Sequence, residues 1–86
     1  MRNVKLLYFA WLRERIGVAE EDLAVPDGVI TIADLIAWLR LRSAGHLAAF
    51  ATTTSLRCAV NQDFATPETL IATGDEIAFF PPVTGG

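Results

Sequence analysis

The sequence predicts an α+β domain in which one mixed β-sheet wraps around a long helix. Three observations support this prediction: β-forming segments lie near both ends of the chain, one segment between them has helical periodicity, and the remaining segments are short and separated by turns. This order of strands and helices is typical of α+β folds. We expect all 86 residues to form one domain, with a body of residues 1–80 and a flexible diglycine tail of residues 81–86.

The N-terminal part is expected to contain two strands joined by a short helix. Residues 4–9 are rich in β-forming side chains and predict the first strand. Leu12 and Ile16 are four residues apart, as on one helix face, and Gly17 is a typical helix stop. Residues 21–25 predict a second strand, which ends at a Pro-Asp-Gly turn signal.

The clearest helix of the sequence follows this turn. Thr31 is a suitable N-cap, and Asp34 stands three residues later, as in a capping box. The next apolar residues recur with helical spacing and form one stripe: Ile32, Leu35, Ile36 and Leu39. Trp38 and Leu41 lie off this stripe, so we expect them to pack under the segment that follows.

The C-terminal part is expected to supply the other strands. Residues 43–55 show no clear pattern, apart from a short helical turn that His46, Leu47 and Phe50 could form. Residues 57–62 predict a third strand, residues 64–65 a brief extended piece, and residues 76–80 the last strand. The first and last strands are the most hydrophobic and are therefore placed side by side in the centre. This arrangement is the β-grasp, or ubiquitin-like, fold.

The end of the chain is its most informative feature. Pro81 and Pro82 hold φ at about −65° and cannot donate to a β-ladder, so they direct the chain out of the sheet. The residues after Phe80 can reach about 20 Å when extended, and Gly85 and Gly86 leave the tip without side chains. Such a tail suits a peptide that enters a narrow active site and presents its terminal carbon for chemistry.

Alternation along the last strand predicts an aromatic face on the sheet. Ile77 and Phe79 share one side of this strand, so Phe80 points to the other side. If Ile77 and Phe79 contact the long helix, Phe80 lies on the outer face beside Phe9, and Phe64 extends the same patch. Apolar patches of this kind mark interaction sites, although loops could also fold over the three aromatic side chains. We predict that Phe9, Phe64 and Phe80 bind a partner.

Composition and charge exclude several classes of function. The net charge is −3, which disfavours nucleic acids and anionic membranes as partners. A single cysteine rules out an internal disulfide and fits a reducing, cytoplasmic setting. No apolar run approaches the roughly 20 residues that span a bilayer, and the charged residues after position 12 argue against a signal peptide.

The reactive side chains do not form a catalytic or metal site by sequence. One histidine and one cysteine cannot make a convincing metal cluster, so no metal is predicted. His46 is expected in a loop with a structural or solvent role, and Cys58 as a buried, inert thiol in register with Val60. Asp75 and Glu76 are adjacent in a strand and point to opposite faces, so they are interpreted as turn residues.

Three groups of residues resemble one known family. They are residues 7–10 (Leu-Tyr-Phe-Ala) with Arg13, Glu14 and Gly17, residues 59–62 (Ala-Val-Asn-Gln), and residues 74–86 (Gly-Asp-Glu-Ile-Ala-Phe-Phe-Pro-Pro-Val-Thr-Gly-Gly). On these residues the chain resembles the MoaD family, the small sulfur-carrier subunits of molybdopterin synthase, over almost its full length. Residues 43–55 carry no motif of the family, so no role is assigned to them.

The resemblance implies a sulfur carrier that is a co-substrate more than a catalyst. A MoeB-like adenylating enzyme would consume ATP to activate the carboxylate of Gly86, and a sulfur donor would convert it to a thiocarboxylate. The thiocarboxylate would pass sulfur to cyclic pyranopterin monophosphate in a MoaE-like large subunit, within a heterotetramer. The carrier itself would bind no cofactor. The residues that enter the large subunit would be Pro81, Pro82, Val83, Thr84 and Gly85.

Three alternatives remain open at this point. A ThiS-like carrier of the thiamin pathway shares the fold and the diglycine tail. A ubiquitin-like protein modifier would instead join Gly86 to a lysine of another protein. A β-grasp interaction module with an inert tail would leave the terminal carboxylate unmodified.

Overall fold

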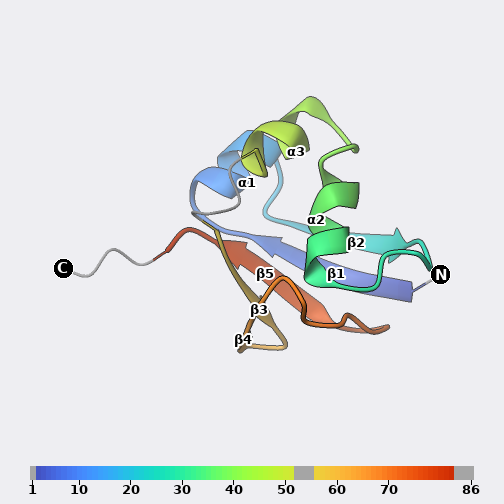
Figure 1. Ribbon diagram of the computed structural model, residues 1–86. Helices are drawn as coiled ribbons and strands as arrows, with labels where there is room; N and C mark the ends of the chain where they lie inside the picture. Colours follow the sequence, from blue (N-terminus) through green and yellow to red (C-terminus); the bar gives the residue numbers. More distant parts are fainter. Residues whose placement is uncertain (1, 52–55, 83–86) are drawn as a thin grey trace.

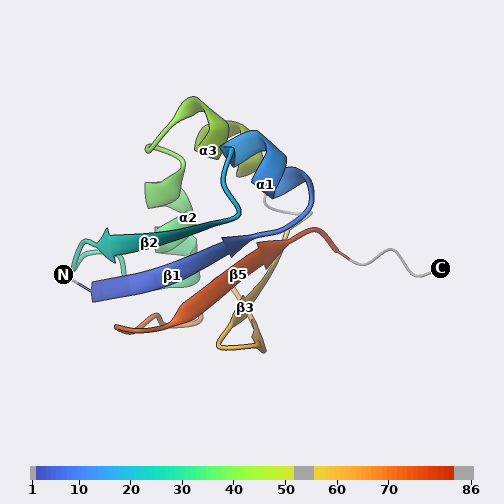
Figure 2. The same ribbon diagram turned by 180° about the vertical axis from the view of Figure 1, so that it is seen from behind.

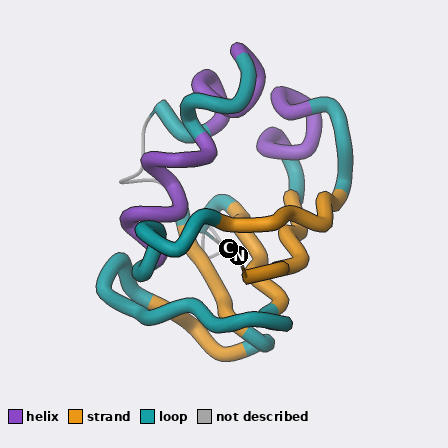
Figure 3. The backbone as a smooth tube through the Cα atoms, turned by 90° about the vertical axis from the view of Figure 1, so that its right-hand side faces the viewer, coloured by secondary structure: helices purple, strands orange, loops and turns teal. Residues whose placement is uncertain are grey.

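The computed structural model describes residues 2–51 and 56–82. Its single sheet has the strand order β2-β1-β5-β3-β4, and the helices lie on one side of it (Figures 1 and 3). The strands are β1 (Arg2–Tyr8), β2 (Glu20–Val25), β3 (Arg57–Val60), β4 (Asp63–Ala65) and β5 (Glu76–Phe80). The helices are α1 (Trp11–Ile16), α2 (Ile32–Leu39) and α3 (Ala44–Ala49).

The two most hydrophobic strands form the centre of the sheet, as predicted. β1 and β5 are parallel, from the pair Lys5 and Glu76 to the pair Tyr8 and Phe79. β2 joins β1, β3 joins β5 and β4 joins β3, in each case antiparallel. The sheet is therefore mixed, and the α+β, β-grasp prediction is confirmed.

The N-terminal elements agree with the sequence pattern with small shifts in their bounds. β1 covers residues 2–8 rather than 4–9, so Phe9 follows the strand, although its N–H still donates to the Phe79 carbonyl at 3.2 Å. α1 ends as predicted at Gly17, which has a φ of 97° and whose N–H donates to the Arg13 carbonyl at 2.9 Å. A positive φ at this position is readily adopted only by glycine.

The capping box of α2 is present. The Thr31 hydroxyl accepts from the Asp34 N–H at 3.2 Å, and the Asp34 carboxylate accepts from the Thr31 N–H at 3.1 Å. The Ile30 N–H also donates to the Asp34 carboxylate at 3.1 Å, and the bonds from Ile30 and Thr31 hold the pKa of Asp34 below its usual value. The N–H groups of Ile32 and Ala33 donate to carbonyls of the 66–71 loop, which ties the start of the helix to the chain before β5.

The long helix is shorter than expected, because the chain forms two helices. α2 has eight residues, and its end tightens into a turn with bonds from Leu41 to Trp38 and from Arg42 to Leu39. Ser43 then caps α3 by accepting the His46 N–H at 3.1 Å. The short helical turn suggested for His46, Leu47 and Phe50 is therefore present, and the expectation that His46 lies in a loop is wrong.

The expectation for Leu41 is also wrong, since its side chain is 84% exposed. Trp38 does pack against the core, but Leu41 lies in the turn between α2 and α3. The segment after this turn folds onto α1 instead of returning over Leu41. Phe50, at the end of α3, is fully buried against Tyr8 and Phe79.

Gly45 permits the close approach of α3 to α1. A Cβ atom at this position would overlap the carbonyl oxygen of Arg15 and lie 3.3 Å from the Ile16 Cα. We expect Gly45→Ala to lower the free energy of unfolding by about 1–3 kcal/mol, because backbone atoms would have to move. Urea titration measures this change. Gly28→Ala is the matched control, since nothing lies within 4 Å of its Cβ, and equal losses in the two variants would contradict the packing argument.

The β3–β4 connection corrects the prediction of a strand over residues 57–62. Asn61 and Gln62 have φ values of 51° and 73°, so they form a two-residue hairpin loop of the type I′ kind. Positive φ at both positions removes them from the strand. Asp63, expected in the turn, is instead the first residue of β4 and pairs with Val60.

Candidate docking face and tail exit

Within the described residues, one face of the sheet carries no helix (Figure 3), and it contains an apolar row. The register places Leu7 opposite Ala78, Ala78 opposite Ala59, and Ala59 opposite Phe64. The intervening residues Tyr8, Cys58 and Phe79 point to the other side and are buried in the core. Figure 2 shows this outer face, with β1 and β5 in front of α2. As predicted, Ile77 and Phe79 point to the core, and Ala78 and Phe80 point to the opposite side of β5.

The three aromatic residues that the sequence analysis selected lie at the same end of this face. Phe64 is 86% exposed and Phe9 is 48% exposed, while Phe80 is half-buried. The rings of Phe64 and Phe80 are 6.3 Å apart. Phe9 adjoins β5 through its backbone bond to Phe79. We name the outer surface of Leu7, Phe9, Ala59, Phe64, Ala78 and Phe80 the docking face.

The tail leaves the sheet beside this face. β5 ends at Phe80, and the half-buried Pro81 and Pro82 follow it. Neither proline has an N–H group that could continue the ladder. The tail residues Val83, Thr84 and Gly85 and the terminal residue Gly86 lie outside the described part of the chain.

The opposite end of the outer face is charged. Lys5 pairs in register with Asp22 on β2 and with Glu76 on β5. Its ammonium group lies 3.6 Å from the Glu20 carboxylate. Charged residues thus surround Lys5 on the outer face, and Glu20, which pairs with Leu7, borders the apolar row on the β2 side.

Two motifs of the family resemblance have structural roles. The Asn61 amide donates to the Asp75 carboxylate at 2.9 Å, and its oxygen accepts from the Glu76 N–H at 3.0 Å. The Asp75 carboxylate also accepts from the Ala72 N–H at 2.7 Å. These bonds join the β3–β4 loop to the turn before β5, so they hold in place the start of the strand that carries the tail. The interpretation as a turn residue agrees with this geometry for Asp75 but is wrong for Glu76, which is the first residue of β5 and pairs with Lys5.

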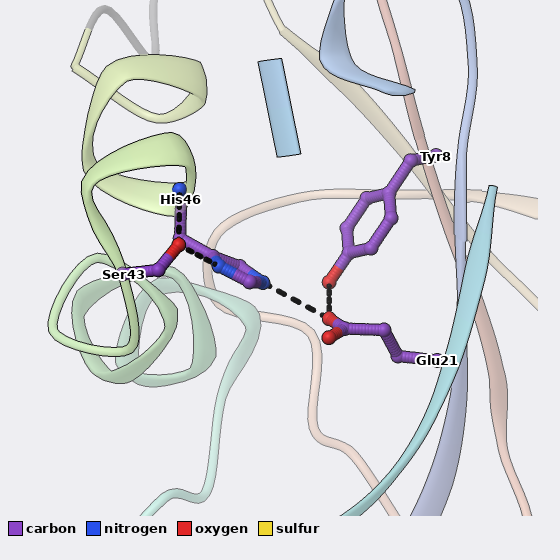
Figure 4. Close-up of polar contacts among 4 residues, drawn as sticks. All are labelled: Tyr8, Glu21, Ser43 and His46. Atoms are coloured by element: carbon purple, nitrogen blue, oxygen red, sulfur yellow. Dashed lines mark hydrogen bonds and ion pairs between the residues drawn. The ribbon is translucent and has the colours of Figure 1, made fainter. Parts of the chain in front are cut away.

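A buried polar network lies beneath the helices and was not predicted (Figure 4). The Tyr8 hydroxyl donates to Glu21 Oε2 at 2.6 Å, and His46 Nε2 lies 3.0 Å from the same oxygen. His46 Nδ1 lies 2.7 Å from the Ser43 hydroxyl. With Nε2–H donating to Glu21 and Ser43 donating to Nδ1, every member is satisfied. No local sequence signal could reveal it, because its residues come from β1, β2 and the start of α3.

The network holds α3 against the sheet. His46 is only 5% exposed, and its ring meets that of Tyr8 edge-on at 6.1 Å. Tyr8 stacks in turn on Phe79, at 6.5 Å between ring centroids. Phe79, which precedes Phe80, thus packs on its helix side against Tyr8, and the polar network fixes the position of Tyr8.

Burial and hydrogen bonding shift the pKa values of this network in opposite directions. Burial, together with the bond to Glu21, raises the pKa of Tyr8, so its hydroxyl remains a donor at neutral pH. Partial burial alone would raise the pKa of Glu21, but the bonds from Tyr8 and His46 outweigh it and hold this pKa below its usual value. Glu21 is therefore an ionised acceptor in the folded protein.

We expect Glu21→Gln to destabilise the fold by about 1–2 kcal/mol at pH 7, because a neutral amide is a weaker acceptor than a carboxylate. The pKa of Glu21 is lower in the folded protein than in the unfolded chain, so its ionised form stabilises the fold. This stabilisation is fully present above the unfolded-state pKa and is lost as the pH falls through the folded-state pKa. Between about pH 5 and pH 3, the free energy of unfolding should therefore fall less in the variant than in the wild type. Urea unfolding over this range tests both effects.

Glu20→Gln is the control for this experiment. Its exposed pair with Lys5 should contribute less than about 1 kcal/mol. An acid dependence that is unchanged in Glu21→Gln would contradict the assigned role of Glu21.

Cys58 is a buried thiol, as predicted. It lies at the bottom of an apolar groove of about 320 Å³ between α2 and β3, lined also by Ile32, Ile36 and Phe79. Burial raises the pKa of Cys58 to about 12, so almost no reactive thiolate exists at neutral pH. Within residues 2–51 and 56–82, no three potential ligands lie close enough together to hold a metal ion.

None of the helices in the described ranges is both long and apolar enough to cross a membrane.

The mixed five-stranded sheet, with helices on one side and exposed aromatic residues on the other, defines a β-grasp protein. Within this class the chain belongs to the ThiS family, whose model matches residues 6–86. The resemblance to the sulfur carrier subunits of molybdopterin synthase is confirmed by relatives that carry this name.

Curated relatives cover nearly the whole chain. The molybdopterin synthase sulfur carrier subunit of Chlamydomonas reinhardtii is 36% identical, over 98% of this chain and 99% of its own. The subunit of the same name from Haemophilus influenzae is 39% identical, over 96% of this chain and 99% of its own. Among solved structures, SAMP1 of Haloferax volcanii has a TM-score of 0.73 at 28% identity, over 98% of this chain and 99% of its own.

Proposed function

We propose that this chain is the sulfur carrier subunit of a molybdopterin synthase and that it carries sulfur at Gly86. The observation that supports this most is the combination of full-length relatives of that name with an exposed aromatic face at the exit of the tail. The face provides a surface by which an enzyme can hold the body of the carrier. The tail that begins at Pro81 then provides the reach into an active site.

The chemistry follows from the terminal carboxylate. Its pKa is about 3.3–3.7 in an unperturbed chain, so it is ionised at neutral pH and is a poor electrophile. A carboxylate oxygen of Gly86 attacks the α-phosphate of ATP, pyrophosphate leaves, and an acyl-adenylate forms. The sulfur atom of a hydrosulfide-level donor then attacks the carbonyl carbon, AMP leaves, and loss of the proton on sulfur leaves the thiocarboxylate. The resulting thiocarboxylate is a nucleophile that needs no side chain of this protein.

The partners follow from this sequence of reactions. A MoeB-like adenylating enzyme consumes the ATP, a separate donor supplies sulfur, and a MoaE-like large subunit holds the catalytic residues and the cyclic pyranopterin monophosphate. The dithiolene of molybdopterin needs two sulfur atoms, so two carriers act in turn. The assembly is a cytoplasmic heterotetramer of two small and two large subunits. The carrier binds no cofactor, nucleic acid or membrane.

The intact mass of the chain tests this proposal. The protein is incubated with ATP, an adenylating enzyme that is active on a known carrier, and a sulfur donor. We expect a mass increase that matches replacement of one oxygen atom by sulfur. No increase under these conditions would contradict the sulfur-carrier function.

Protein modification is the second candidate function, and one observation favours it. The structurally similar SAMP1 of Haloferax volcanii is named a small archaeal modifier protein. A modifier would join Gly86 to lysine side chains and would produce high-mass conjugates in cells. Conjugates that disappear when Gly86 is deleted would support this function.

Two further alternatives have separate tests. A ThiS-like carrier would co-purify with a thiazole synthase rather than with a molybdopterin synthase large subunit. A plain interaction module would keep an unmodified carboxylate under all the conditions above.

A further inference from the structure

Arg57 lies on the docking face at the point where the tail leaves the sheet. It is the first residue of β3 and pairs directly with Phe80, the last residue of β5. Its neighbour Cys58 points into the core opposite Phe79, so alternation places Arg57 on the outer side with Phe80. The side chain is exposed. An arginine thus borders the aromatic patch at its tail end.

The guanidinium of Arg57 has little to bind within the described residues. Its Nη1 donates to the carbonyl of the adjacent Leu56 at 3.2 Å, and no described carboxylate pairs with it. Lys5, the cation at the other end of the outer face, has Glu20 as a partner. A guanidinium has five N–H donors in a fixed fork. Most of those of Arg57 are therefore directed to solvent in the isolated chain.

A partner that covers the aromatic patch would change this environment. Phe64 and Phe80 can be buried only by a surface that reaches both rings, which are 6.3 Å apart. Because Arg57 pairs with Phe80, the same surface would remove water from the guanidinium. A charge that loses its water without gaining a partner weakens binding strongly. An anionic group opposite Arg57 would offset this cost and stabilise the complex.

We propose that Arg57 is a specificity-determining residue of the docking face and that the molybdopterin synthase large subunit presents a carboxylate to it. The inference rests on the proposed function. A carboxylate fits the fork of a guanidinium through two parallel hydrogen bonds, which fixes orientation as well as affinity. Since Arg57 lies beside Phe80, this contact aligns the carrier where its tail begins.

The experiment measures affinity for the large subunit of the same synthase by calorimetric titration at low and high salt. We expect Arg57→Gln to raise Kd at least about tenfold and Arg57→Glu to raise it further, because like charges would meet. Wild-type affinity should fall with added salt more steeply than that of Arg57→Gln. Arg40→Gln is the matched control, an exposed arginine at the end of α2 on the helix side of the sheet. It should bind as the wild type does.

A second set of variants locates the partner group. Acidic residues of the large subunit are replaced one at a time by their amides and titrated with wild type and with Arg57→Gln. One of them should weaken binding of the wild type but have little further effect on Arg57→Gln, as a coupled pair requires. Absence of such coupling at every acidic residue would overturn the inference. Circular dichroism and urea unfolding of each carrier variant exclude loss of the fold as the cause.

The outcomes separate this inference from the function on which it rests. If the wild type does not bind the large subunit, the proposed function fails and the inference fails with it. If Phe80→Asp loses binding but Arg57→Gln and Arg57→Glu bind as the wild type does, the face is correct and only the role of Arg57 is wrong. Loss of binding in Phe80→Asp, Arg57→Gln and Arg57→Glu, with Arg40→Gln unaffected, supports both the docking face and the role of Arg57.

Discussion

Phe80→Asp is expected to weaken binding of the large subunit by about a hundredfold or more, the effect of losing a central aromatic residue of an interface. Phe80 packs beside Phe64 on the docking face, so the substitution removes apolar contact and places a charge in its centre. The fold should change little, because the Phe80 side chain lies on the side of β5 opposite the core. Calorimetric titration gives Kd, and urea unfolding gives the stability.

Leu41→Asp is the matched control for this variant. It introduces the same charge at an apolar residue that is 84% exposed, in the turn after α2. It should leave Kd within about twofold, as expected for a surface position outside an interface. Wild-type affinity in Phe80→Asp would show that the aromatic side of the sheet is not the docking face.

Deletion of Gly86 is expected to abolish activation, with no sulfur-dependent mass increase and no synthase activity. The terminal carbon is the reacting atom in the proposed chemistry, and a chain that ends at Gly85 would present its carboxylate about 3.5 Å short of the catalytic groups. Intact mass after incubation with the adenylating enzyme measures activation, and release of molybdopterin measures the second step.

Docking should survive this deletion nearly unchanged. The docking face supplies most of the apolar contact in the proposed complex, and Gly86 is not one of its residues. We expect Kd for the large subunit to change by less than about fivefold, since few interface residues account for most of the binding energy. Loss of binding on deletion of Gly86 would show that the tail, rather than the face, carries the affinity.

Local sequence patterns were sufficient for most elements of the fold. The Thr31–Asp34 capping box and the apolar stripe after it predicted α2, and Gly17 predicted the end of α1, because caps and helical periodicity depend on residues only a few positions apart. The limits of β3 were predicted less well. Asn61 and Gln62 adopt positive φ although neither is a glycine, and nothing in the sequence pattern required this.

The candidate site was predicted in part. Phe9, Phe64 and Phe80 were selected by the alternation of side chains along strands, and the structure brings them to one end of the outer face. Arg57 was not selected, because its position beside Phe80 depends on how β3 pairs with β5. Pairing between strands about 20 residues apart in sequence has no local signal.

The sequence by itself determined the β-grasp class, the tail with its terminal diglycine and the resemblance to sulfur carriers, since each depends on short motifs or on periodicity. Only the tertiary structure decided that Tyr8, Glu21 and His46 form one network, and that Arg57 lies beside Phe80 at the end of β5 from which the tail leaves. The reason is physical: burial, desolvation and cross-strand register arise only when distant segments pack together, and these effects bring separate residues into one network and one outer face.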